Sequence, residues 1–290
     1  MEIFQKIKRI TIEALVSSDE LLDQLVLKGG NALDLVYDFT SRSSFDIDFS
    51  IENEFEELST ISTLIKKSLE KTFTKYEYQI IDFDFKEKPD GGTSEDLKDF
   101  WGGYTLKFKV IETIAYQKYK HNPQLLRGHT ISINDTQHKT IKVDVSKYEY
   151  CSTKLKRELD GQIIFVYSPP MIVIEKLRAI CQQMDNYLLL VRSTSKSQRA
   201  KDFYDIFEII TRYRIDLTTA DNIELTKNIF SAKKVPLQLI GEIEKTKEFH
   251  ESGYPSLVDT INSVNKIESF EFYFDFVVEQ AQKLKPLWYK

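Results

Sequence analysis

The sequence is poor in the residues that build zinc sites, disulfide frameworks and membrane spans. Its 290 residues include two cysteines, Cys151 and Cys181, and four histidines that are scattered along the chain. Neither set has the spacing of a zinc site, and two cysteines do not form a disulfide framework, so a reducing compartment fits. No segment reaches the roughly 20 apolar residues of a membrane span, and the N-terminus lacks the apolar block of a signal peptide. We therefore expect a cytoplasmic protein with no membrane partner.

The overall composition is that of a globular protein with a sizeable core. Hydrophobic residues make up 41% of the chain, charged residues make up 29%, and the formal net charge is -5. An acidic balance argues against broad nonspecific coating of nucleic acid, although a local basic face is compatible with it. A chain of this length forms one large domain or two of ordinary size.

The first half of the chain mixes strand and helix patterns. Strands are predicted near 24–28, 45–50, 76–86, 103–111, 129–134 and 139–146, and helices over 1–23, 31–39 and 55–73. The glycine-rich stretch 88–103 reads as a loop. These patterns predict an α/β (α+β) core with a sheet of mixed direction.

The second half is almost entirely helical in pattern. Ser168 followed by Pro169 and Pro170 is typical of a helix start, with serine as the N-cap. Helices are predicted near 169–192, 197–214, 219–230, 234–249, 254–265 and 268–284. We therefore predict a core domain over 1–165 and a C-terminal helical bundle over 166–290.

One stretch near the N-terminus points to phosphate chemistry. A short apolar run over 24–28 ends at Lys28-Gly29-Gly30, and an amphipathic helix pattern follows. A glycine turn between strand and helix exposes backbone N–H groups beside a helix N-terminus, and such a place binds phosphates.

The next strand carries two carboxylates on one face. Phe45, Ile47 and Phe49 alternate with polar residues, so Asp46 and Asp48 point the same way, roughly 6.6 Å apart at Cα. Such a pair can hold magnesium ions. A lone pair of this kind is usually a solvated strand face, and the chain repeats the pattern at Asp82 and Asp84 without a glycine turn upstream. We therefore assign the metal to the first pair.

Three later positions extend this hypothesis. Asp144 lies on the polar face of the predicted strand near 139–146 and is a third carboxylate of the kind that two-metal sites use. Lys176 follows on the first helix of the second half and can neutralise a triphosphate. Arg199, Asp202 and Asp205 share a helix face, which on its own is typical of local ion pairs.

Together these residues resemble the DNA polymerase β-like nucleotidyltransferases and, more narrowly, the AbiEii/AbiGii toxin family. That family's pattern is Lys-Gly-Gly-x-x-Leu, Arg-x-Ser-x-Asp-x-Asp, a strand Asp, a helix Lys and an Arg-x-x-Asp-x-x-Asp helix. The matching residues are Lys28, Gly29, Gly30 and Leu33, then Arg42, Ser44, Asp46 and Asp48, then Asp144, Lys176, Arg199, Asp202 and Asp205. Gly30 stands where the wider superfamily has serine, and either Arg199 or Lys201 can take the basic role. The last 80 or so residues carry no matching motif.

The resemblance implies a nucleotidyltransferase core, a helical C-terminal domain and transfer of a nucleoside monophosphate from an NTP to a hydroxyl. It implies Mg²⁺ or Mn²⁺ on Asp46, Asp48 and Asp144. The phosphates would contact the residues Lys28, Gly29, Gly30, Arg42, Ser44, Lys176 and Arg199. Either Asp144 or Asp202 would orient the acceptor. The biological role would be that of a toxin opposed by an antitoxin protein, in an abortive-infection or toxin–antitoxin system, with tRNA as a reasonable acceptor.

Two other functions fit the same residues. A small-molecule nucleotidyltransferase, of the aminoglycoside-modifying kind, suits the acidic net charge. A non-catalytic nucleotide-binding protein would need neither metal nor acceptor, and the presence of Asp46, Asp48 and Lys176 argues against it.

Overall fold

The computed structural model describes residues 2–39, 46–132, 139–193, 195–261 and 266–289. Its centre is one mixed seven-stranded sheet in the order β3-β4-β5-β2-β1-β7-β6. The strands are β1 (Val26–Leu27), β2 (Ile47–Ser50), β3 (Tyr78–Lys88), β4 (Gly103–Glu112), β5 (Thr140–Ser146), β6 (Leu155–Leu159) and β7 (Gln162–Val166). The pairs β2–β5 and β1–β7 are parallel, and the others are antiparallel, so the predicted mixed sheet is confirmed.

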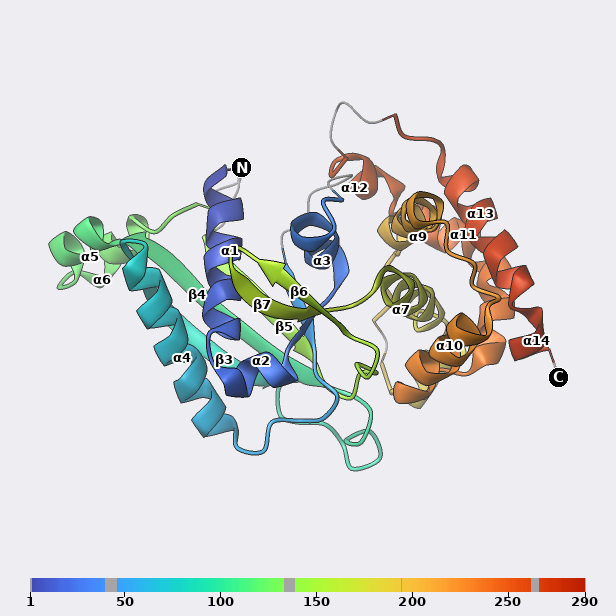
Figure 1. The fold of residues 1–290 in the computed structure, drawn as a ribbon, viewed down its shortest axis with the longest axis horizontal. Coiled ribbons are helices and arrows are strands. Elements are labelled where there is room, and N and C mark those ends of the chain that lie inside the picture. Colours follow the sequence, from blue (N-terminus) through green and yellow to red (C-terminus); the bar gives the residue numbers. More distant parts are fainter. Residues whose placement is uncertain (1, 40–45, 133–138, 194, 262–265, 290) are drawn as a thin grey trace.

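Six helices of the described chain belong to the sheet half. They are α1 (Glu2–Val16), α2 (Asp19–Gln24), α3 (Gly29–Val36), α4 (Leu58–Lys75), α5 (Thr113–Tyr119) and α6 (Pro123–Gly128). Helices α1 and α4 lie side by side against the sheet, and α3 lies between α1 and the C-terminal helices (Figure 1).

The C-terminal helices gather beside the sheet (Figure 1). They are α7 (Pro169–Cys181), α8 (Asp185–Leu190), α9 (Ala200–Tyr213), α10 (Ala220–Ala232), the 3-10 helix η1 (Leu237–Thr246), α11 (Lys247–Glu251), α12 (Tyr254–Val258), α13 (Phe270–Lys283) and α14 (Lys285–Trp288). The Ser168 side chain accepts a hydrogen bond from the backbone N–H of Met171, as the predicted N-cap requires. Within the described residues, no helix has the length and apolar character needed to cross a bilayer.

Several predicted elements differ from the structure. Residues 129–132 are not a strand, and the segment between β4 and β5 contains α5 and α6 instead. The β6–β7 hairpin was not predicted. The helix expected over 169–192 is interrupted, because Met184 takes an extended conformation between α7 and α8. Residues 234–249 form a 3-10 helix followed by α11, and Pro236 precedes the first of these.

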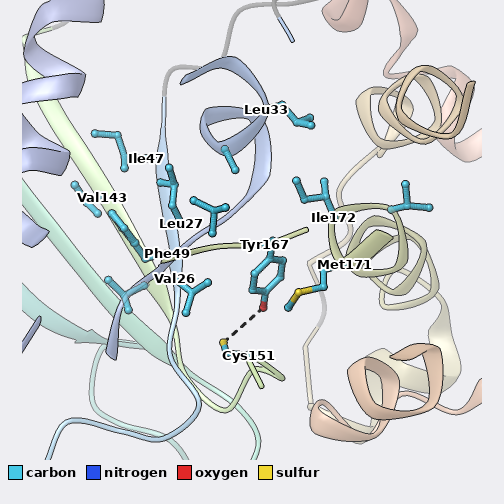
Figure 2. Close-up of a cluster of buried hydrophobic side chains, with 14 of the residues drawn as sticks. Val26, Leu27, Leu33, Ile47, Phe49, Val143, Cys151, Tyr167, Met171 and Ile172 are labelled. Atoms are coloured by element: carbon cyan, nitrogen blue, oxygen red, sulfur yellow. Dashed lines mark hydrogen bonds between the residues drawn. The ribbon is translucent and has the colours of Figure 1, made fainter. Parts of the chain in front are cut away.

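A continuous core joins the sheet to α7. Val26, Leu27, Phe49 and Val143 from the strands and Met171 and Ile172 from α7 are all buried (Figure 2). Between them lies Tyr167, whose hydroxyl donates a hydrogen bond to Ser50 Oγ over 2.9 Å and lies 4.0 Å from the sulfur of Cys151. This packing fixes α7 relative to β1 and β2. The division into domains at residue 165 stays a prediction.

Candidate active site

A cleft of about 1080 Å³ lies where the carboxylate-bearing strands face α7 and α9. Predicted site residues line it from both halves of the chain: Lys28, Gly29, Gly30, Asp48, Asp144, Lys176, Arg199 and Asp202. The structure therefore brings together residues that are up to 174 positions apart in the sequence, from 28 to 202. Asp46 is not among the lining residues, and its side chain is 58% exposed.

The glycine turn is built by β1 and α3. The backbone N–H of Lys28 donates to the carbonyl of Asp48 over 3.0 Å, which holds the turn against β2. Gly29 has a φ of +63°, in the left-handed region that favours glycine, and a Cβ there would lie 3.3 Å from Asp48 Oδ2. Asn31 donates to the backbone carbonyl of Asp46 and ties α3 to the start of β2. Gly29, at the start of α3, thus lies beside the Asp48 carboxylate.

Asp48 and Asp144 are neighbours in the sheet. They are directly paired in the parallel register of β2 and β5, so their side chains point to the same face. Burial raises the pKa of Asp48 to about 6, with Lys28 opposing that shift and the carboxylates of Asp144 and Asp46 adding to it. Asp48 is thus a carboxylate whose charge is only partly compensated within the protein.

Asp144 is held by three donors. Its Oδ1 accepts from Lys88 over 2.7 Å and from Thr105 over 2.8 Å, and its Oδ2 lies 2.5 Å from Lys142. Burial would raise the pKa of Asp144, but hydrogen bonds from Lys142, Lys88 and Thr105 outweigh it and lower that pKa. Asp144 is therefore ionised at neutral pH.

The predicted metal ligands supply oxygen donors but do not form a closed cluster. In the part of the chain that the structure describes, no three His, Cys, Asp or Glu side chains are grouped closely enough to hold a metal ion. Lys142 lies 2.5 Å from Asp144 and 4.0 Å from Asp46, between two of the three predicted ligands. The metal assignment to Asp46, Asp48 and Asp144 stays a prediction. Asp82, from the second Asp-x-Asp pattern, forms ion pairs with Lys109 and Arg127.

The predicted helical residues meet on the opposite wall. Lys176 is buried and pairs with Asp202 Oδ1 over 2.8 Å and with Asp205 Oδ2 over 2.7 Å. Arg199 lies 3.6 Å from Asp202 Oδ2. These ion pairs fix Lys176 and Arg199 at the cleft, where Lys201 also lies. Arg42 and Ser44 lie outside the described residues.

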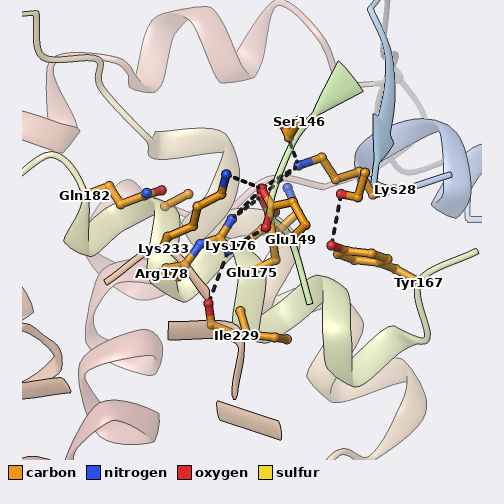
Figure 3. A network of polar contacts seen from close by, with 12 residues as sticks. Lys28, Ser146, Glu149, Tyr167, Glu175, Lys176, Arg178, Gln182, Ile229 and Lys233 are labelled. Carbon is orange, nitrogen blue, oxygen red and sulfur yellow. Dashed lines mark hydrogen bonds and ion pairs between the residues drawn. The ribbon is translucent and has the colours of Figure 1, made fainter. Parts of the chain in front are cut away.

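A buried ion-pair network in the wall of the cleft was not predicted from the sequence (Figure 3). Glu149 lies at its centre and contacts Arg178 at 2.7 Å, Lys28 at 3.5 Å and Lys233 at 3.7 Å. Burial would raise the pKa of Glu149, but these three cations hold it well below its ordinary value. The network joins the glycine turn to α7 and to the end of α10.

Lys28 is the member of this network that reaches the predicted phosphate turn. Its ammonium group donates to Ser146 Oγ over 3.2 Å and lies 3.5 Å from Glu175. Burial alone would lower the pKa of Lys28, but Glu149 and Glu175 outweigh it and raise that pKa. Lys28 therefore stays cationic beside Asp48. Nothing in the local sequence around Glu149, Arg178 or Lys233 marks them, because their proximity arises only from the tertiary fold.

The fold is similar to that of a solved structure described as a nucleotidyltransferase. A candidate nucleotidyltransferase from H. pylori is 16% identical, covers 98% of this chain and 94% of its own, and has a TM-score of 0.50. JHP933 from Helicobacter pylori is 17% identical, with coverage of 98% and 91% and a TM-score of 0.49. No curated protein sequence matches the chain. A model of the family described as nucleotidyl transferase AbiEii toxin, type IV toxin–antitoxin system, matches residues 12–275, and the chain belongs to this family.

Proposed function

We propose that the cleft transfers a nucleoside monophosphate from an NTP to a hydroxyl group and releases pyrophosphate. The observation that carries this proposal is the pairing of Asp48 with Asp144 in one cleft with the Gly29 turn and Lys176. Paired carboxylates and phosphate-binding groups in one cleft are what nucleotidyl transfer requires, since charge develops on both the attacking and the leaving oxygen.

The phosphates would bind along the turn and the facing helices. The N–H groups at the start of α3 favour an anion, and Lys28 stays cationic beside them. Lys176 and Arg199 add positive charge from α7 and α9, pre-positioned by Asp202 and Asp205. Arg42 and Ser44 join this set through the family motif alone.

Asp48 and Asp144 are oxygen donors of the kind that a magnesium or manganese ion takes, while the third predicted ligand, Asp46, is not grouped with them. Asp48 and Asp144 are paired oxygen donors, and the raised pKa of Asp48 reflects negative charge that a divalent cation would compensate. Asp46 would complete the set once Lys142 moves away from its place between Asp46 and Asp144. When bound, the ion would neutralise the triphosphate and lower the pKa of an attacking hydroxyl.

The acceptor hydroxyl would lie beside Asp144. This carboxylate is ionised, lines the cleft and lies next to Asp48, so it can take the proton of a hydroxyl. Asp202 is the other candidate, but it lies on α9 rather than beside Asp48, and it pairs there with Lys176 and Arg199. We therefore assign Asp202 to the positioning of Lys176.

RNA, and tRNA in particular, is the acceptor class that suits a toxin of this family, and an antitoxin protein is the expected counterpart. A screen of α-labelled NTPs against total tRNA and against aminoglycosides tests the acceptor, with Asp46→Ala as the companion variant. We expect metal-dependent label on tRNA that Asp46→Ala reduces strongly. Label on the aminoglycosides alone would contradict the RNA acceptor, and label on neither would contradict the enzyme. Unimpaired growth on expression without an antitoxin would contradict the toxin role.

A further inference from the structure

The cleft has two chemically different ends along the sheet wall. Thr105 is paired with Asp144 in the β4–β5 register, and Gly103, two residues earlier, is paired with Ser146. Trp101 precedes Gly103 by another two residues and also lines the cleft. Trp101 thus precedes β4 and lies outside the β4–β5 pairing that carries Asp144.

The wall formed by α7 also carries different side chains toward the two ends of the cleft. Lys176, Ala179 and Gln182 all line the cleft from α7 and the residue that follows it. Six residues separate Lys176 from Gln182, which corresponds to about 9 Å along a helix. In Figure 3, Gln182 and Lys28 lie on opposite sides of Lys233 and Glu149. Lys28 and Lys176 thus lie toward one end of the cleft, and Gln182 lies toward the other.

Tyr187 connects Trp101 to Gln182. The rings of Trp101 and Tyr187 are 6.2 Å apart between centroids, and Gln182 Nε2 donates to the Tyr187 hydroxyl over 3.1 Å. That hydroxyl in turn donates to the carbonyl of Lys233 over 2.9 Å. The second end of the cleft therefore holds a half-buried indole beside a side-chain amide that is fixed in orientation.

We infer that Trp101 and Gln182 form the subsite for the nucleobase of the NTP. The inference rests on the proposed function, because the phosphates must bind at the Gly29 and Lys176 end. An indole ring offers a stacking surface to any base, and a fixed amide offers a donor and an acceptor to its edge. A triphosphate at the charged end directs its base toward the indole, so Trp101 supplies affinity and Gln182 supplies discrimination between bases.

The decisive experiment compares two ligands that share the phosphate end only. Protein carrying Trp288→Phe retains Trp101 as its one tryptophan, and Trp288 lies against Gly241, outside the cleft lining. This protein is titrated with α,β-methylene NTP analogues and with inorganic tripolyphosphate, both with magnesium. We expect the analogues to quench the Trp101 emission and tripolyphosphate to bind without that quench.

Substitutions in the otherwise natural chain then separate stacking from folding. Trp101→Ala should weaken analogue binding by roughly five- to hundredfold, because base stacking on an aromatic ring is lost, and should leave tripolyphosphate binding unchanged. Trp101→Phe, which keeps a stacking surface, should retain most of the affinity. Gln182→Ala should reduce the differences in affinity among the α,β-methylene analogues of the four NTPs.

The failures of the two proposals are distinguishable. If the analogues bind equally well to Trp101→Ala and to the natural chain, the base subsite is wrong and the proposed function stands. If Trp101→Ala weakens tripolyphosphate by the same factor, Trp101 acts on the phosphate end or on folding, and the subsite is again wrong. If neither ligand binds the natural chain, the proposed function fails and the subsite fails with it.

Discussion

Asp48 is a site residue whose ionised form is destabilised by the fold. Its pKa is raised from 3.8 to about 6 by burial and by neighbouring carboxylates. Between pH 3.8 and about pH 6, Asp48 is therefore protonated to a greater extent in the folded state than in the unfolded state. The contribution of Asp48 to stability falls as the pH rises through this window, and the full penalty applies above about pH 6.

Asp48→Asn should therefore stabilise the protein at neutral pH. Removing the charge of this half-buried side chain should raise the free energy of unfolding by about 2–3 kcal/mol at pH 7, and the gain should shrink toward zero as the pH approaches 4. Urea unfolding of both proteins across this range measures the difference. The exposed Asp46→Asn is the matched control and should change stability by less than about 0.5 kcal/mol. A gain that does not depend on pH would contradict the charge-based account.

Glu149 is the opposite case, a buried carboxylate with three cationic neighbours. Glu149→Gln leaves Arg178, Lys28 and Lys233 without their shared partner and should cost about 3–5 kcal/mol in the free energy of unfolding. Because the pKa of Glu149 is held low, its stabilising effect is present at neutral pH and is lost as the pH falls into the acid range.

Chemical denaturation at pH 7 tests this prediction, with Glu158→Gln on β6 as the control at an exposed position. An equal, small effect for both variants would show that the network does not stabilise the fold.

The sequence predicted the cleft residues Asp48, Asp144 and Lys176 because each lies in a local pattern. It did not predict Glu149 or Arg178, whose significance depends on a contact between residues 29 positions apart.

At the scale of elements, the site depends on close approach between β4 and β5. A Cβ on Gly103 would lie 2.3 Å from the carbonyl oxygen of Val145, a distance that the paired backbone cannot accommodate without moving. Gly103 thus keeps β4 against β5 next to Asp144, whose partner Thr105 follows two residues later.

Gly103→Ala should therefore separate the strands locally and cost about 1–3 kcal/mol, as overpacking does. Amide hydrogen exchange across β4 and β5 should show faster exchange near Val145 and Thr105. Gly128→Ala on α6 is the control, because a Cβ there meets nothing within 4 Å. Unchanged protection in Gly103→Ala would contradict the close packing.

Elements with strong local patterns were predictable, and those defined by tertiary context were not. The alternation over 47–50, the glycine turn and the Ser168 cap gave β2, α3 and the start of α7. The β6–β7 hairpin was missed because Lys156, Arg157 and Glu158 leave one strand almost without apolar residues. The interruption between α7 and α8 was missed because hydrophobic residues continue on both sides of it.

At the scale of the whole molecule, the cleft exists because two structurally different halves pack on each other. The sheet supplies the carboxylates and the glycine turn, while α7 and α9 supply Lys176 and Arg199. The buried core around Tyr167 and the Glu149 network hold these walls together (Figures 2 and 3). The mixed sheet followed by helices was predictable from composition shifts along the chain, but the way in which the halves meet was not.

The most direct test of the nucleotidyl-transfer proposal follows the two ends of the triphosphate separately. NTP labelled at the α-phosphate and NTP labelled at the γ-phosphate are each incubated with the protein, magnesium and total tRNA. We predict that the α label enters RNA and the γ label leaves as pyrophosphate. Asp48→Asn and Lys176→Met should each reduce both signals by at least about a hundredfold, the size of effect expected for groups that stabilise transition-state charge. Transfer of the γ label to RNA, or undiminished α transfer by Asp48→Asn, would contradict the account.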